Sequence, residues 1–203
     1  FDSCWQYTLE PDNQERNFGC DPQTFRLRRH AHSMIVLNVL QQLRLFREEA
    51  TDQSRIDQCL HYMLKYHQKP ERRLVLELVG WEDGALIPGW MGRWVTPGHM
   101  IEGGIFLIHE ALHRSDQKIK QDGLNWIRWG FEIGWDKEHG GLFNDVDADN
   151  LPKPASEALL AESKLWWQHT EALYGLLLAY QESNDAWFWE AYQKTHQYSF
   201  THF

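Results

Sequence analysis

The 203-residue sequence has no apolar run of about 18 residues, which excludes a transmembrane helix. It shows no signal or transit peptide, and it begins at Phe1, not at methionine. The net charge is −9 and no basic cluster is present, so we expect neither nucleic acid nor a membrane surface as a partner. The three cysteines, Cys4, Cys20 and Cys59, are odd in number and lack metal-site spacing, which favours a reducing, cytoplasmic compartment.

Aromatic residues and histidine are abundant instead. The chain holds 11 Trp and 11 His, many of them near glycine or proline, in a composition that is 42% hydrophobic and 24% charged. This balance is typical of a globular protein. The tryptophans fit either a Trp-rich core or a carbohydrate site, where the C–H face of a sugar stacks on a flat indole.

Helical periodicity dominates the sequence. One face is predicted from the spacing of Val36, Val39, Leu40, Leu43 and Phe46. Helices are predicted over 31–49, 52–67, from Pro97, over 116–133, over 156–181 and from Asp185, which is a suitable N-cap. A short hairpin is expected over 74–79. Six helices in three antiparallel pairs predict an all-α fold, and both ends of the chain look cut.

The segment TPGHMIEGG, residues 96–104, is the first candidate for chemistry. Pro97 suits the first helical turn, which places His99 near a helix N-terminus and Glu102 one turn further along the same face. A carboxylate beside a histidine prepares a general base. Gly103 and Gly104, inside a helix, predict close approach of another backbone or a ligand. The alternative is a capping histidine beside a surface glutamate.

The segment KLWWQHTEALYGLLLAY, residues 164–180, is the second candidate. One helical face should carry a mixed polar and aromatic stripe, formed by Lys164, Trp167, Gln168, Glu171 and Gly175. Such a stripe either lines a pocket or is a solvated face that carries one tryptophan. His169 projects away from the stripe.

Two further clusters could suggest metal ions. The loop over 134–150 contains Asp136, Asp145, Asp147 and Asp149, but it lacks the EF-hand pattern, so turn chemistry explains it better than calcium binding. The histidines of the HAH segment at 30–32 are alternate residues of a helix and point apart. We therefore expect no metal site.

Three blocks in order resemble the N-acylglucosamine 2-epimerase family, which includes a renin-binding protein. PGHMIEGGIFL resembles its P-G-H-x-x-E block, GWDKEHGGLFNDVDADN its G-W-D-x-x-H-G-G-L-F segment, and KLWWQHTEAL its K-L-W-W-x-H-x-E-A block. Gln168 departs from the proline often found at its position. The resemblance runs through nearly all of the chain and implies a single, incomplete (α/α)6 barrel domain over 1–203, the central to C-terminal part of a catalytic toroid of antiparallel helix hairpins.

The resemblance also implies a reaction. Family members interconvert N-acetylglucosamine and N-acetylmannosamine by removing and returning the C2 proton of the open-chain aldehyde, which needs no redox cofactor. His99, Glu102 and Glu171 are implied as catalytic residues. Further sugar contacts are implied for Trp167, Lys164, Gln168, His169 and Arg93.

Other implications concern the whole protein. The family's second catalytic histidine lies in an F-H-V-P-R segment, which we expect beyond Phe203, so the isolated chain should not epimerise. ATP or another nucleotide is implied as an allosteric activator, and a homodimer and a renin-type partner as assemblies. The alternatives are a cellobiose or mannose 2-epimerase or isomerase of the same fold, a non-catalytic interaction protein, and a glycoside hydrolase that uses two carboxylates.

Overall fold

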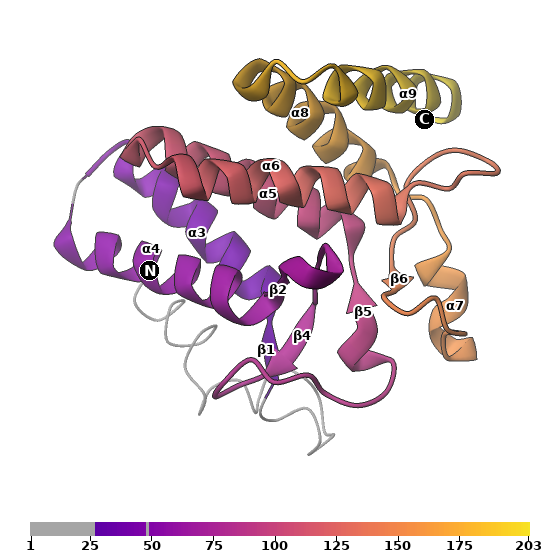
Figure 1. Ribbon diagram of the computed structural model, residues 1–203, viewed down its shortest axis with the longest axis horizontal. Coiled ribbons are helices and arrows are strands. Elements are labelled where there is room, and N and C mark those ends of the chain that lie inside the picture. The colour runs from indigo at the N-terminus through magenta and orange to yellow at the C-terminus, as the bar shows by residue number, and fades with distance from the viewer. Residues whose placement is uncertain (1–26, 48) are drawn as a thin grey trace. The chain divides into compact units, whose positions relative to one another are not determined.

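The computed structural model of the protein describes residues 27–47 and 49–203, which divide into two compact units (Figure 1). The described part of unit 1 comprises residues 27–47, 49–68 and 76–93, and unit 2 comprises 69–75 and 94–203. Both are mainly helical, which confirms the predicted all-α class. One domain over 1–203 stays a prediction. Among the described helices, none combines the length and apolar character that a membrane crossing requires.

Unit 1 is built on a pair of helices, α3 (His30–Arg44) and α4 (Ala50–His61), which pack against each other. A π-helical segment, Tyr62–His67, continues α4, so the helix predicted over 52–67 is confirmed. Cys59 lies on α4 as a free thiol, and burial raises its pKa to about 12. The other two cysteines lie outside the described residues.

Two local predictions do not hold in full. Val36 and Leu40 of the predicted stripe are buried as expected, but Val39 and Phe46 are exposed. The buried face of α3 also carries polar Ser33 and Gln41. The hairpin over 74–79 does not form either. Strand β4 (Leu78–Gly80) pairs antiparallel with β1 (Leu27–Arg29), about fifty residues earlier in the chain. A short helix, Met91–Arg93, follows in this unit.

Unit 2 centres on a hairpin of two long helices, α5 (Pro97–Arg114) and α6 (Gln117–Gly134), whose contact is the most extensive in the described residues. Two glycines let the backbones meet. A Cβ atom on Gly104 would lie 2.7 Å from the carbonyl oxygen of Gly123, and one on Gly123 would lie 2.7 Å from that of Gly104. The close approach predicted from Gly104 is therefore confirmed, and the neighbour is a backbone.

The remaining elements of unit 2 frame this hairpin. They are β3 (Leu74–Val75), β5 (Trp94–Val95), β6 (Val146–Asp147), α7 (Ala155–Ala161), α8 (Trp166–Ser183) and α9 (Ala186–His202). Strand β5 pairs antiparallel with β6, which ties the start of α5 to the loop after α6. A short strand, β2 (Gln68–Lys69), and a 3-10 turn, Pro70–Arg72, precede β3.

The single helix predicted over 156–181 is wrong, because the chain breaks between α7 and α8. Two backbone carbonyls near the break accept bonds from the loop instead of continuing the helical ladder. Asp145 N–H donates to the oxygen of Ala161 (3.0 Å), and Asn144 N–H donates to that of Ser163 (2.9 Å).

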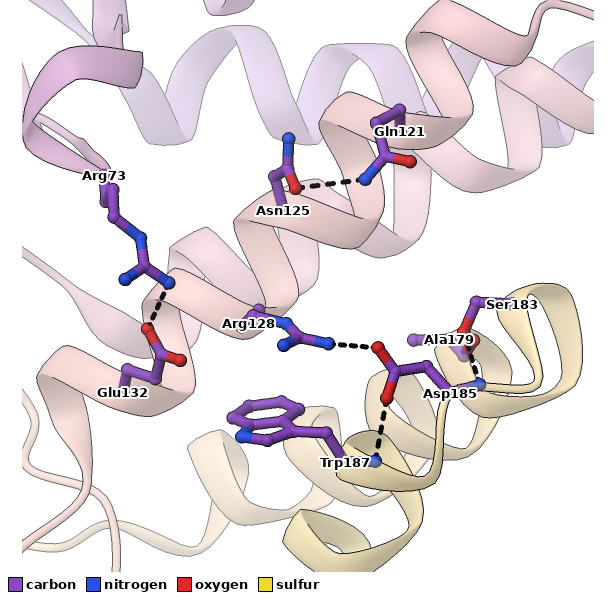
Figure 2. Close-up of polar contacts among 9 residues, drawn as sticks. All are labelled: Arg73, Gln121, Asn125, Arg128, Glu132, Ala179, Ser183, Asp185 and Trp187. Carbon is purple, nitrogen blue, oxygen red and sulfur yellow. Dashed lines mark hydrogen bonds and ion pairs between the residues drawn. The ribbon is translucent and has the colours of Figure 1, made fainter.

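Helices α8 and α9 form the third hairpin (Figure 1). The turn contains Asn184 in the left-handed conformation (φ 55°). Asp185 then caps α9, since its carboxylate accepts the N–H of Trp187 at 2.9 Å, which confirms the predicted N-cap. Figure 2 shows the same carboxylate receiving the Arg128 guanidinium of α6 at 2.6 Å. In the described residues, six long helices thus pair as predicted, and α7 is the separated first part of the helix predicted over 156–181.

Candidate active site

The first turn of α5 carries the predicted histidine. Pro97 occupies the first turn, where its missing N–H costs nothing, and His99 follows, half-buried. A Cβ atom on Gly98 would lie 2.6 Å from ring atoms of Trp167 and from Cγ of Gln168. Glycine at this position therefore lets the start of α8 pack directly onto the start of α5.

This packing brings both candidate motifs together in unit 2. The ring centroids of His99 and Trp167 lie 5.4 Å apart, with the rings inclined by 37°. Further along α8, a Cβ atom on Gly175 would lie 3.0 Å from Ile101, so this part of the predicted stripe packs on α5. Gly175 thus belongs to a packing face, whereas Trp167 and Glu171 of the same stripe are half-buried.

Two carboxyl groups complete the arrangement. Burial, followed by the charge of Glu171, raises the pKa of Glu102 from 4.5 to about 7, while His99 acts in the opposite direction. Burial also raises the pKa of Glu171. Near neutral pH, Glu102 therefore exists in both its acidic and its ionised form. The imidazole of His99, beside two carboxyls whose pKa values are raised, can move a proton to or from a bound molecule.

Lys164 lies outside α8, because the helix begins at Trp166. Its ammonium donates to Asp136 Oδ2 at 2.6 Å. Burial alone would raise the pKa of Asp136, but the bonds from Lys164 and from the N–H groups of His139 and Glu138 outweigh it and lower the pKa to about 2. Asp136 is thus a turn acceptor, as predicted for this loop. Both side chains line a hollow of about 500 Å³.

Gln168 and His169 are fully buried, and their polar atoms bond to protein groups. The ring of His169 donates from Nδ1 to the oxygen of Leu165 (2.7 Å) and accepts the N–H of Leu142 at Nε2 (3.0 Å). Burial lowers the pKa of His169, in keeping with a neutral ring. These bonds give both residues a structural role, and sugar contacts by either one stay a prediction. Arg93 belongs to unit 1, and its role stays a prediction.

A second hollow, of about 480 Å³, lies between α6 and the α8–α9 turn. Its two arginines are engaged, because Arg73 pairs with Glu132 and Arg128 with Asp185 at 2.6 Å each (Figure 2). The paired carboxylates neutralise the two guanidinium groups, so the hollow does not favour an anionic ligand.

Both motifs lie within a match to a known family. The sequence profile described as N-acylglucosamine 2-epimerase (GlcNAc 2-epimerase) matches residues 13–203. The chain belongs to the N-acylglucosamine 2-epimerase family. Over 173 residues it is 38% identical to the N-acylglucosamine 2-epimerase of Rattus norvegicus and 33% identical to that of Homo sapiens. The match covers 84% of this chain but only 40% and 39% of these relatives' lengths.

Solved structures of this family's fold superpose well on the chain. A cellobiose 2-epimerase from Bacillus thermoamylovorans gives a TM-score of 0.70 at 18% identity, over 86% of this chain and 42% of that one. A D-mannose isomerase also gives 0.70, at 14% identity, over 87% and 46%. These likenesses confirm a partial (α/α)6 barrel.

Sequence reasoning missed three contributors to the site. Gly98 has no local signal, because only the folded chain shows that Trp167 and Gln168 pack against it. Asp145 was attributed to turn chemistry and Asn144 was not singled out, although both belong to one of the blocks that resemble the family. In the structure both are buried between the starts of α5 and α8.

Proposed function

We propose that the full-length protein interconverts N-acetylglucosamine and N-acetylmannosamine. The observation that carries the proposal is the placement of His99 beside Trp167, with Glu102 and Glu171 at the same place in unit 2. The curated relatives at 33–38% identity are named for this activity, which supports the amino-sugar substrate over cellobiose or mannose.

The proposed reaction begins with the open-chain sugar, whose C1 carbonyl makes the C2 proton acidic. His99 carries one of the two proton transfers at C2, through a planar enediolate that receives a proton on the opposite face. Ionised Glu102 orients the imidazole and raises its basicity. Glu171 hydrogen-bonds the sugar or the developing enediolate, and the indole of Trp167 flanks the sugar. No electron is gained or lost, so the chemistry requires no redox cofactor.

Deuterium uptake at C2 tests the proposal. The full-length protein is incubated in D2O with N-acetylmannosamine, and exchange and product are followed by NMR. His99→Ala should reduce turnover by about 100-fold or more, the scale of general acid–base contributions. His113→Ala provides the matched control, because His113 is an exposed histidine in the last turn of the same helix and should leave turnover unchanged.

Substrate choice separates the alternatives. Exchange with glucose, mannose or cellobiose, but not with the N-acetylated sugars, would retain a 2-epimerase and refute the amino-sugar assignment. Absence of exchange with every sugar would refute the enzymatic proposal and favour an interaction protein. Full activity of His99→Ala would remove His99 from the mechanism.

A further inference from the structure

A continuous series of hydrogen bonds begins at the N-terminus of α8. The N–H of Leu165, the residue before the helix, donates to Oε1 of Gln168 at 3.1 Å. Nε2 of Gln168 donates to Oδ1 of Asn144 at 2.6 Å, and Nδ2 of Asn144 donates to Oδ2 of Asp145 at 2.6 Å. This series of hydrogen bonds thus runs from α8 into the loop after α6.

A second arm reaches the same carboxylate from the start of α5. Oδ1 of Asp145 accepts the indole N–H of Trp94 (2.7 Å) and the hydroxyl of Thr96 (2.6 Å), the residue that precedes α5. The four residues Thr96, Asn144, Asp145 and Gln168, here called the clamp, have exposed fractions between 0% and 8%. Little water can replace their mutual bonds, so each bond has to be satisfied within the protein.

The direction of these bonds is fixed at both ends. The backbone N–H of Leu165 and the indole N–H of Trp94 can only donate. Each amide between them accepts on one side and donates on the other, so both arms arrive at Asp145 as donors. A carboxylate, which only accepts, is needed where they meet. With an amide at position 145, two donors would face each other somewhere along this series of hydrogen bonds.

We propose that Asp145 is a positioning residue of the active site, setting the starts of α5 and α8 against each other. The inference rests on the proposed function, since it assigns a catalytic consequence to this register. His99 lies three residues after Thr96, and Trp167 directly precedes Gln168. The clamp therefore holds the two helix turns whose rings lie 5.4 Å apart, where Gly98 contacts the indole.

The polarity argument supplies a charge-shift test. Asp145→Asn leaves two donors facing each other, and Gln168→Glu places Asn144 between two carboxylates. The double variant Asp145→Asn/Gln168→Glu restores a series of hydrogen bonds in which every donor faces an acceptor. In it, the new amide at position 145 donates to a reversed Asn144 amide, which donates to the new carboxylate at position 168, which accepts the N–H of Leu165. The net charge is unchanged in the double variant.

The experiment measures kcat, KM and thermal unfolding for the full-length wild type, both single variants and the double variant. Asp145→Asn should lower kcat by about 10- to 100-fold at a temperature where the protein remains folded, because small displacements of reacting groups carry costs of this size. The double variant should recover kcat well above either single variant. Asp149→Asn, at an exposed carboxyl of the same loop, should leave kcat unchanged.

The outcomes are separable. A folded Asp145→Asn variant with wild-type kcat would overturn the inference, as would a double variant no better than the worse single one. If Asp145→Asn does not fold, the comparison of Gln168→Glu with the double variant decides in the same way. If the wild type lacks epimerase activity, the proposed function fails, and the Tm values of the four proteins then test the clamp alone. If the double variant does not recover Tm relative to the single variants, the clamp is refuted.

Discussion

Glu102→Gln probes the most strongly shifted carboxyl of the site. Burial and the neighbouring charge of Glu171 raise the pKa of Glu102 from 4.5 to about 7 in the folded protein. The unfolded chain, in contrast, releases this proton near the ordinary value. Glutamine has nearly the same shape and carries no proton to lose, so the variant removes the ionisation with little change in packing.

The sign follows from proton linkage. Between pH 4.5 and about 7 the folded state binds more protons at this site than the unfolded state, so the free energy of unfolding falls as the pH rises through this range. The two pKa values correspond to an upper limit of about 3 kcal/mol, at about 1.4 kcal/mol for each pH unit. Because solvent reaches part of the side chain, we expect about 1 kcal/mol.

Urea unfolding of the wild type and of Glu102→Gln at pH 4.5, 6 and 8 measures the effect. Relative to the difference in unfolding free energy between variant and wild type at pH 4.5, the variant should be more stable than the wild type by a further amount of about 1 kcal/mol at pH 8. Glu190→Gln, at an exposed carboxyl of α9, controls for the loss of one negative charge and should not reproduce the gain. A difference that is constant with pH, or that grows toward acid, would refute the reasoning.

Three further variants test the packing and the caps. Gly104→Ala should destabilise the α5–α6 hairpin, because overpacking costs about 1–3 kcal/mol and a better helix propensity returns only about 1 kcal/mol; unchanged urea unfolding would contradict it. His169→Phe should cost about 1–3 kcal/mol in the same assay, since the buried N–H of Leu142 loses its acceptor. Asp185→Ala should cost about 1 kcal/mol at neutral pH. The N–H of Trp187, followed by Arg128, lowers the pKa of Asp185, so this cost should disappear in acid.

The helices could be predicted where their signals are local. Pro97 marked a helix start by its fixed backbone angle and missing N–H, and Asp185 by a carboxylate that can accept a backbone N–H; the structure confirms both. The face of α3 was predicted only in part, because the buried polar residues Ser33 and Gln41 interrupt its apolar period. The pairing of β1 with β4 depends on tertiary contact between segments far apart in sequence, so nothing local to residues 74–79 could reveal it.

The candidate site divides in the same way. His99 and Glu102 were found because their spacing lies within one helix turn. The sugar contacts of Gln168 and His169 were implied by the family resemblance, and the helical period does not show what either side chain packs against. Their bonds to Asn144 and Leu142 come from a loop more than twenty residues away, and only the folded chain shows that these polar atoms are engaged.

The stability of unit 2 and the chemistry of its site act against each other. A carboxyl at Glu102 that holds its proton up to about pH 7 makes folding less favourable at neutral pH, and burial beside Glu171 is the cause. Glu102 lies one turn after His99 on α5, where the charge of Glu171 on α8 reaches it. Relaxing the packing around Glu102 would lower its pKa and remove this electrostatic cost, but it would also lose packing between α5 and α8 and separate His99 from Trp167. Glu102→Gln removes the ionisation without that loss, so this variant should gain stability toward neutral pH and lose turnover.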